Sequence, residues 1–225
     1  MKLIVMEGLD GAGKSTQVNM LREYLEAKGE KVHFLHFPRT DDPFYGEMVA
    51  RFLRGELGAL HQVDPYLVAM LYAGDRAHFA PQLQRWLDAG DWVILDRYVY
   101  SNIAFQCAKI QDIEKRETLA KWILDLEFTY HNIPRPALNL FLDVPFIFTE
   151  KKLMNQRDGA DREYLNGQTD IHEADLSFQQ TVREVYLWLA TLGENLKVIN
   201  CSSNEGSMLS PDEISTKVLT NLKEI

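Results

Sequence analysis

Residues 8–15 read Gly-Leu-Asp-Gly-Ala-Gly-Lys-Ser and match the phosphate-binding pattern G-x-x-x-x-G-K-S/T. Glycines at this spacing let the backbone curl until several N–H groups point inward at phosphate oxygens. In this pattern the lysine reaches the β- and γ-phosphates, and the serine hydroxyl is a ligand of Mg²⁺. We call residues 8–15 the phosphate loop. The predicted ATP-binding residues are Gly8, Asp10, Gly11, Ala12, Gly13, Lys14, Ser15 and Thr16.

A second group of reactive side chains follows the apolar run Val93-Ile94-Leu95. If this run is a buried strand, Asp96 emerges at the carboxyl edge of the sheet, where such folds bind ligands. Asp96 can then hold Mg²⁺ through water, and Arg97 can clamp a phosphate with two hydrogen bonds. Read alone, the pair could instead be a strand-terminal ion pair, which is the less favoured alternative. The sequence contains no Asn-Lys-x-Asp, the usual guanine-reading signal, which favours ATP over GTP.

The elements that would position these groups alternate along the chain. Apolar runs predict five strands, and amphipathic patterns between them predict helices, an order typical of a parallel sheet. The expected strands cover 2–6, 31–37, 92–95, 137–142 and 196–200. The expected helices cover 14–28, 64–88 (where Pro81 could cause a break), 113–128, 146–157, a segment around 178–189, and a final helix after the capping box Ser210–Glu213. We therefore predict a single α/β domain over residues 1–225, with three α/β/α layers. The aperiodic polar segment at about 157–170 is predicted to be a lid.

Composition narrows the functional classes. The 225 residues carry 24 Lys and Arg against 33 Asp and Glu, a formal charge of −9, which argues against broad nucleic-acid binding. The longest apolar stretch is interrupted by Asp143, so no run reaches the about 20 residues that span a membrane. The apolar start runs straight into Glu7, too early for a signal peptide, and we expect a cytoplasmic protein. Its two cysteines, Cys107 and Cys201, are expected to be reduced thiols.

Several short segments together resemble one known family. They are Glu7–Thr16, Phe37-Pro38-Arg39, Tyr72–Arg76, Asp96-Arg97-Tyr98 with Ser101 and Ala104-Phe105-Gln106, and Arg157–Arg162. From residue 3 to about 190 the chain resembles the thymidylate kinases, with these segments in the family's order. The resemblance implies a P-loop NTPase fold, Mg²⁺-dependent phosphoryl transfer from ATP to dTMP for dTTP synthesis, and a homodimer.

The resemblance also implies roles for residues on the acceptor side. Asp10 would contact the sugar 3′-hydroxyl, Arg39 would hold the acceptor 5′-phosphate, and Arg97 would bring the two phosphates together. Tyr72 would stack on the pyrimidine and Arg76, one helical turn later, would read its edge. The remaining residues expected at the acceptor are Ser101, Gln106 and Tyr164, of which Tyr164 would crowd the sugar 2′ position.

Catalytic arginines are implied in the lid. Some family members carry an arginine inside the phosphate loop, but here that place is Gly11. Arg157 and Arg162 resemble the alternative arrangement, in which a lid arginine neutralises charge on the transferred phosphoryl group. The predicted catalytic residues are therefore Lys14, Arg97, Arg157, Arg162 and Asp10, and the predicted metal-binding residues are Ser15 and Asp96.

Other readings of the same residues stay open. Tyr72 could be a core aromatic, the two lid arginines could be solvated, and His172 is read as structural. Arg51 and Arg54 could line the acceptor site, although a solvated helix face is expected of them. A kinase for another nucleoside monophosphate or for a deoxynucleoside is the nearest alternative function. A nucleotide-binding regulator without catalysis is another, and a DNA-acting ATPase fits the acidic chain poorly.

Overall fold

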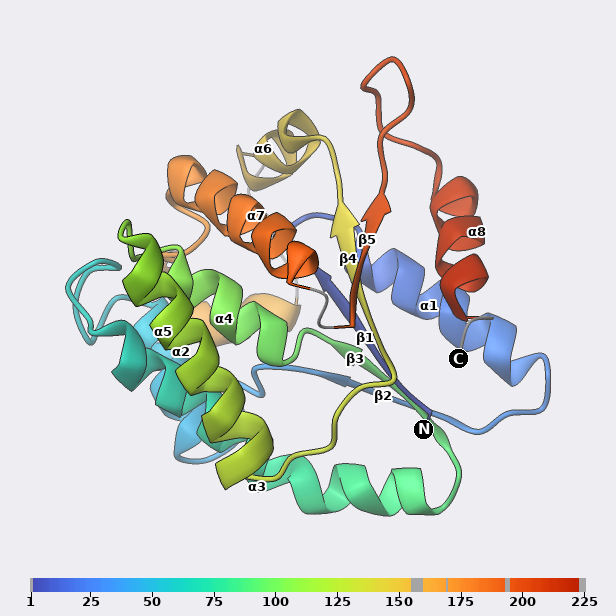
Figure 1. The fold of residues 1–225 in the computed structure, drawn as a ribbon, viewed down its shortest axis with the longest axis horizontal. Coiled ribbons are helices and arrows are strands. Elements are labelled where there is room, and N and C mark those ends of the chain that lie inside the picture. Colours follow the sequence, from blue (N-terminus) through green and yellow to red (C-terminus); the bar gives the residue numbers. More distant parts are fainter. Residues whose placement is uncertain (1, 155–159, 169, 193–194, 223–225) are drawn as a thin grey trace.

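The fold is taken from a computed structural model that describes residues 2–154, 160–168, 170–192 and 195–222. Five parallel strands form one sheet in the order β2-β3-β1-β4-β5 (Figure 1). Their bounds are β1 Leu3–Gly8, β2 Val32–His36, β3 Trp92–Asp96, β4 Leu138–Asp143 and β5 Leu196–Asn200. All five agree with the predicted strands to within two residues at either end, so the predicted five-stranded parallel sheet is confirmed.

Helices cover both faces of the sheet, which gives the three predicted layers (Figure 1). Alternate residues of β1 explain this: Leu3 and Val5 point into one apolar cluster, and Ile4 and Met6 into another on the opposite face. The first cluster is shared with α2, α3, α4, α5 and α7, and the second with α1 and α8. The bounds are α1 Lys14–Glu26, α2 Tyr45–Leu53, α3 Pro65–Asp88, α4 Val99–Cys107, α5 Ile113–Leu124, α6 Phe146–Met154, α7 Leu176–Thr191 and α8 Pro211–Leu222.

The helix ends follow the predicted capping chemistry. Asp64 Oδ1 accepts a hydrogen bond from the Tyr66 amide at 2.8 Å, and Pro65 occupies the first helical position of α3. At α8, Ser210 Oγ accepts from the Glu213 amide while Glu213 Oε2 accepts from the Ser210 amide, at 3.3 and 2.8 Å. This reciprocal pair is the predicted capping box.

Three helical segments differ from the sequence-based expectation. α3 runs through Pro81 without a break, because buried residues on both sides of it, Ala73 and Leu83, pack into the core and outweigh one lost hydrogen bond. α5 ends at Leu124, and the chain continues as a π-helical turn, Asp125–Tyr130. α2 and α4 were not predicted. All nine residues of α4 are buried, so it lacks the polar face by which a surface helix is recognised.

The parallel strands bring their carboxyl ends to one edge of the sheet. Gly8, His36 and Asp96 end three neighbouring strands there, and the phosphate loop begins at the first of them. This is the edge at which open α/β sheets bind ligands. Within the described residues, no helix combines the length and the apolar character that crossing a membrane requires.

Candidate active site at the carboxyl edge of the sheet

The phosphate loop connects β1 directly to α1. Gly11 and Gly13 have φ values of 76° and 83°, a left-handed backbone that glycine adopts without strain. The Lys14 ammonium lies back over the loop and donates to the carbonyl oxygens of Gly8 and Leu9, at 3.3 and 3.0 Å. Burial, and next to it the Arg97 charge, lower the pKa of Lys14. An arriving polyphosphate would relieve both effects, so this lysine is poised to bind an anion.

Asp96 ends β3 beside the phosphate loop, as predicted. Its Oδ1 lies 4.0 Å from Lys14 Nζ, and its Oδ2 lies 3.3 Å from His36 Nδ1. Burial opposes ionisation of Asp96, but Lys14 and His36 outweigh it and lower the pKa of the carboxyl. Oδ1 is buried and accepts no hydrogen bond from any residue that the structure describes. The Ser15 side chain is exposed at the start of α1.

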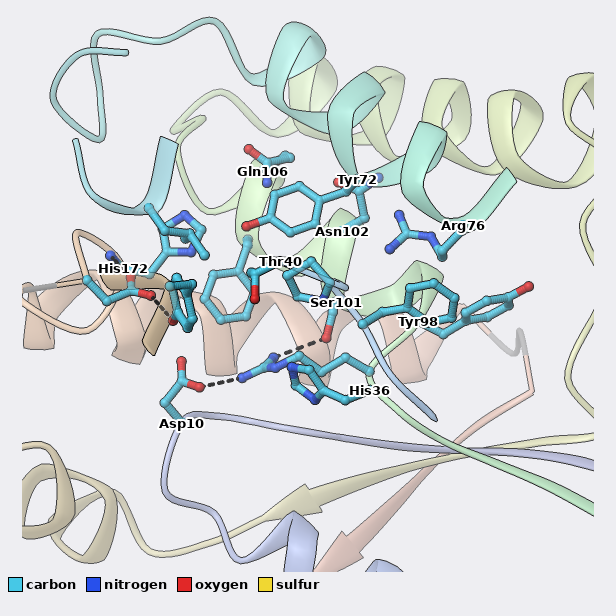
Figure 2. A pocket seen from close by; sticks show the side chains of 17 residues that line it. Asp10, His36, Thr40, Tyr72, Arg76, Tyr98, Ser101, Asn102, Gln106 and His172 are labelled. Carbon is cyan, nitrogen blue, oxygen red and sulfur yellow. Dashed lines mark hydrogen bonds and ion pairs between the residues drawn. The ribbon is translucent and has the colours of Figure 1, made fainter. Parts of the chain in front are cut away.

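Arg97 connects the phosphate loop to α4. Its Nη2 donates to Asp10 Oδ1 at 2.8 Å and its Nη1 to Ser101 Oγ at 3.1 Å (Figure 2). Burial lowers the pKa of Arg97, but the Asp10 charge outweighs burial, so the pKa is raised above its usual value. Its backbone is left-handed, with φ at 67°. The two bonds fix the guanidinium between Asp10 of the phosphate loop and Ser101 of α4.

A buried carboxylate behind Arg97 organises this junction. Glu7 is fully buried, and it accepts hydrogen bonds from Ser101 Oγ, from Tyr186 Oη at 2.9 Å and from the Tyr98 amide at 3.0 Å. Burial raises the pKa of Glu7 against the lowering effect of these donors. Sequence reasoning did not assign Glu7 this role. Its place inside an otherwise apolar strand was the available signal, since buried charges are kept only with partners.

Arg39 follows β2 and lies in a second network of acidic residues. Its Nη2 is 2.7 Å from Asp75 Oδ1 and 3.0 Å from Asp42 Oδ2, and its amide donates to Asp75 Oδ2 at 2.9 Å. Asp75 is almost fully buried on α3. A side chain at Gly46 would collide with the Arg39 carbonyl, so glycine allows α2 to approach this loop closely.

Two clefts meet at this edge. The wider one, about 640 Å³, is lined by the phosphate loop together with Arg39, Asp96 and Arg97. The narrower one, about 110 Å³, extends from Arg97 to Tyr72 and Arg76 on α3. Both are lined by Asp10, His36, Pro38, Thr40, Arg97 and Tyr164, so they adjoin. We call the narrower one the acceptor pocket.

The inner end of the acceptor pocket carries polar groups of complementary kinds. Figure 2 shows the Tyr72 ring across the pocket from Asp10, with Asn102 and Gln106 beside the ring. Asn102 Oδ1 and Gln106 Nε2 are buried and form no hydrogen bond within the described part of the chain. One free acceptor and one free donor, next to a cationic Arg76, match the hydrogen-bonding edge of a base.

Arg76 is held from behind by Glu127, which sequence reasoning missed. Glu127 is fully buried in the π-helical turn, and both of its oxygens accept from Arg76, one of them from Nε at 2.8 Å. Glu127 Oε1 also accepts from Asn102 Nδ2 at 3.0 Å. Burial lowers the pKa of Arg76, but the Glu127 charge outweighs burial and raises it. A π-helical turn often marks a functional site, but nothing in the sequence connects positions 76 and 127.

The predicted lid residues are placed only in part. Arg157 lies outside the described residues. Arg162 belongs to a 3₁₀ helix, Ala160–Leu165, but its side chain also lies outside them. Tyr164 does line the acceptor pocket, as expected, and its hydroxyl donates to Asp170 Oδ2 at 2.9 Å.

His172 lines the acceptor pocket as well as packing in the core. Its ring lies 4.8 Å from that of Phe105 and 5.4 Å from that of Phe52, and burial lowers its pKa well below the usual range. The neutral imidazole has one buried nitrogen, Nε2, that meets no partner among the residues described. The structural reading of His172 therefore holds, and a place in the pocket wall adds to it.

Comparison with known proteins agrees with this geometry. A sequence model of the family described as Thymidylate kinase matches residues 6–209. A probable thymidylate kinase of Thermococcus kodakarensis is 35% identical over 204 residues, 88% of each chain, and a thymidylate kinase of Mycobacterium tuberculosis is 34% identical, over 85% of this chain and 86% of its own. The solved thymidylate kinase of Candida albicans shares the fold, with a TM-score of 0.72 at 21% identity, over 99% of this chain and 91% of that one.

A phosphate loop facing an adjoining pocket across one arginine, on a five-stranded parallel sheet, defines a P-loop phosphotransferase. Within that class, the matches place the chain plainly. The chain belongs to the thymidylate kinase family.

Proposed function

We propose that this protein transfers the γ-phosphoryl group of ATP to dTMP and releases ADP and dTDP. Membership of the thymidylate kinase family supports the reaction and its two substrates. The observation that carries the proposal is the junction of the two clefts at Asp10 and Arg97. A nucleotide that fills the acceptor pocket with its base would present its phosphate to the phosphate loop.

The acceptor is recognised at both ends in this proposal. Tyr72 stacks on the pyrimidine, Arg76 donates to a base carbonyl, and Asn102 Oδ1 accepts the base N3–H, which uses the polar groups left free in the pocket. At the other end Arg39 binds the 5′-phosphate. Asp10 faces the sugar between them, where a carboxylate accepts a hydrogen bond from the 3′-hydroxyl.

Catalysis then consists of positioning and charge neutralisation. The nucleophile is already a phosphate oxygen, so no general base is needed. Lys14 and Arg97 offset the repulsion between two anions that must approach each other. Arg157 or Arg162 would add a positive charge on closure of the lid, which also excludes water and limits wasteful ATP hydrolysis.

We infer that Mg²⁺ accompanies ATP. The Ser15 hydroxyl would be a direct ligand, and Asp96 would hold the ion through water. The buried oxygen Asp96 Oδ1, which has no hydrogen-bond donor among the described residues, fits such a water ligand. When bound, the ion supplies positive charge to the β- and γ-phosphates.

A homodimer and a cytoplasmic location complete the proposal. Two large apolar side chains of α3, Leu67 and Met70, are 56% and 45% exposed, which suits a surface that a second copy covers. The two cysteines, Cys107 and Cys201, are free and buried, as suits a reducing compartment. Sedimentation of the purified protein would decide the oligomeric state.

The test of the proposed function is ADP release with MgATP and a panel of acceptors: dTMP, dUMP, UMP, CMP, dGMP and thymidine. We expect dTMP to have the highest kcat/KM and thymidine to be inert, because it lacks the phosphate that Arg39 and Arg97 bind. A different preferred monophosphate would overturn the base recognition by Tyr72 and Arg76. ATP binding without transfer to any acceptor would favour the regulatory alternative.

A further inference from the structure

Arg54 is placed quite differently from the solvated face expected of it. It caps the carboxyl end of α2, and its side chain is only 12% exposed. Its Nη1 donates to the backbone carbonyl of Tyr164 at 2.6 Å, and its Nε donates to Glu56 Oε1 at 2.5 Å. One guanidinium therefore connects α2 to a segment 110 residues later in the chain.

A second bond ties the same two segments together. The Ile171 amide donates to the Leu53 carbonyl at 3.0 Å, at the last residue of α2. Gly55 lies against Ile171. Its φ of 76° is a left-handed backbone conformation that glycine adopts with little strain. Between these two attachments the chain forms one wall of the acceptor pocket through Tyr164 and Asp170.

The wall is also braced internally. Asp170 accepts from the Tyr164 hydroxyl through Oδ2 at 2.9 Å, and from the His172 amide through Oδ1 at 2.7 Å. The Tyr164 ring is therefore fixed at its hydroxyl by Asp170 and at its backbone by Arg54. Removing the Arg54 side chain would take this hydrogen bond from the Tyr164 carbonyl and so release one of the two fixed points.

The place of Tyr164 shows which part of a nucleotide this wall meets. Tyr164 lines both clefts, the one that contains Tyr72 and Arg76 and the one that contains the phosphate loop. In a nucleotide the sugar lies between base and phosphate, so a residue shared by both clefts faces the sugar. A sugar with one more hydroxyl group needs more room at this wall than deoxyribose does.

We propose that Arg54 is a positioning residue that fixes the Tyr164–Asp170 wall against the acceptor sugar, and so sets the affinity for dTMP and the preference for deoxyribose over ribose. The inference rests on the proposed function. It is a role for the carboxyl end of α2, through hydrogen bonds to the wall rather than through contact with the substrate.

Arg51 provides a matched control. It lies one turn earlier on α2 and also donates to Glu56, at 3.0 Å, but its side chain is 42% exposed. Its hydrogen bonds go to Glu56 and Met48, and none of those described reaches the wall. Arg51→Ala removes the same charge from the same helix while leaving the attachment intact.

The experiment compares Arg54→Ala, Arg54→Lys and Arg51→Ala for kcat and KM with dTMP and with its ribonucleotide, 5-methyluridine 5′-monophosphate. For Arg54→Ala we expect KM for dTMP to rise about five-fold, the scale of one ordinary hydrogen bond, because Arg54 acts through the wall and not on the substrate, with a smaller change in kcat. The ratio of kcat/KM for deoxyribose over ribose should fall by a similar factor. Arg54→Lys should lie between Arg54→Ala and the wild type, and Arg51→Ala should match the wild type within two-fold.

Hydrogen exchange supplies a readout that does not depend on turnover. Amides of residues 163–168 and 170–172 should exchange faster in Arg54→Ala than in Arg51→Ala, with equal thermal unfolding temperatures for the two variants. Equal exchange in the two variants, or an unchanged deoxyribose preference in Arg54→Ala, would overturn the proposal. If Arg54→Ala unfolds, the same comparison is made with Arg54→Lys. A wild type inactive on dTMP would refute the proposed function instead, and exchange would still decide whether Arg54 fixes the wall.

Discussion

The phosphate loop and the acceptor pocket are built in opposite ways. The loop is one run of eight residues between β1 and α1, and it binds through backbone N–H groups and one lysine. The pocket collects side chains from α3, α4, the loop after β2 and the segment before α7. Its Arg76 cation is fixed by a buried carboxylate, Glu127, just as Arg39 in the adjoining cleft is fixed by Asp75.

Because of this difference, the chemical step and the selection of the acceptor depend on different regions. A backbone cradle accepts any polyphosphate, so the loop supplies phosphoryl-transfer chemistry without naming the acceptor. A pocket whose donors and acceptors are fixed from behind rejects a base that leaves them unpaired, because each buried unpaired group costs about 1–3 kcal/mol. Damage to the two regions should therefore produce distinct kinetic signatures.

Arg97→Ala should have the largest effect, since Arg97 serves both regions. Losing a charge that is shared by donor and acceptor phosphates should lower kcat by about 10³-fold or more. Asp10 and Ser101 lose a partner as well, so thermal unfolding is measured alongside ADP release. A folded variant with near wild-type turnover would remove Arg97 from the reaction.

Lys14→Met should damage the donor side alone. Turnover should fall by about 10²- to 10³-fold, the scale of removing one preorganised charge from a transferring phosphoryl group. The affinity for dTMP, measured by calorimetry, should stay within two-fold of the wild type. A parallel loss of dTMP affinity would show that the two regions are not separate.

Glu127→Gln should damage the acceptor side alone. It leaves the buried Arg76 charge without its counter-charge, and breaking a buried pair typically costs about 3–5 kcal/mol of folding free energy. We expect lower kcat/KM for dTMP and poorer discrimination against dCMP, with unchanged affinity for an ATP analogue. Urea unfolding and a two-acceptor assay measure both effects, and unaltered base preference would exclude Glu127 as a positioning residue.

Tyr72→Ala should weaken dTMP binding through lost stacking. Stacking contributes about 1–3 kcal/mol per base, so KM should rise about 5- to 150-fold with a smaller change in kcat. Tyr72→Phe is the control: the hydroxyl makes no hydrogen bond to another described residue, so KM should remain close to that of the wild type. If Tyr72→Ala also kept the wild-type KM, Tyr72 would be a core residue only.

Asp170→Asn should have the smallest effect, and that effect should be visible as a change in how stability depends on pH. Burial, with the Asp10 and Glu173 carboxylates, raises the pKa of Asp170 to about 7, while Tyr164 and His172 donate hydrogen bonds to it. Between about pH 4 and 7 the folded state then retains a proton that the unfolded chain has lost, so this carboxyl makes stability fall as pH rises through that window. Because asparagine does not ionise, Asp170→Asn removes this contribution to the dependence of stability on pH. Urea unfolding at pH 5, 6, 7 and 8 should show a wild-type advantage over the variant that shrinks up to about pH 7 and then levels off, whereas a constant difference would contradict the raised pKa.

The two regions also differed in how far the sequence alone could predict them. The phosphate loop is contiguous, and residues 3–6 of β1 beside it are an unbroken apolar run, so local pattern is enough for both. Glu127 stands 51 residues from Arg76, and Arg54 stands 110 from Tyr164. Only the folded chain brings such partners together. Periodicity also missed α4, since all its residues are buried and it has no polar face.

The resemblance of short motifs to a family predicted some of these long-range neighbours. Tyr72, Arg76, Gln106 and Tyr164 do line one pocket, together with Asp10 and Arg97. Arg39 lines the adjoining cleft with the phosphate loop. The supporting groups Glu7 and Glu127 needed the fold, because their chemistry is to hold other residues.

The most direct test of the account is calorimetric titration of the Lys14→Met variant with dTMP and with dCMP. If the acceptor pocket selects the base without help from Lys14, this variant should keep the wild-type preference. Cytosine offers an amino group where thymine offers a carbonyl, and it lacks the N3–H that Asn102 Oδ1 would accept. We predict wild-type affinity for dTMP and at least ten-fold weaker binding of dCMP. Equal binding of the two nucleotides, or loss of dTMP binding in a folded variant, would contradict the account.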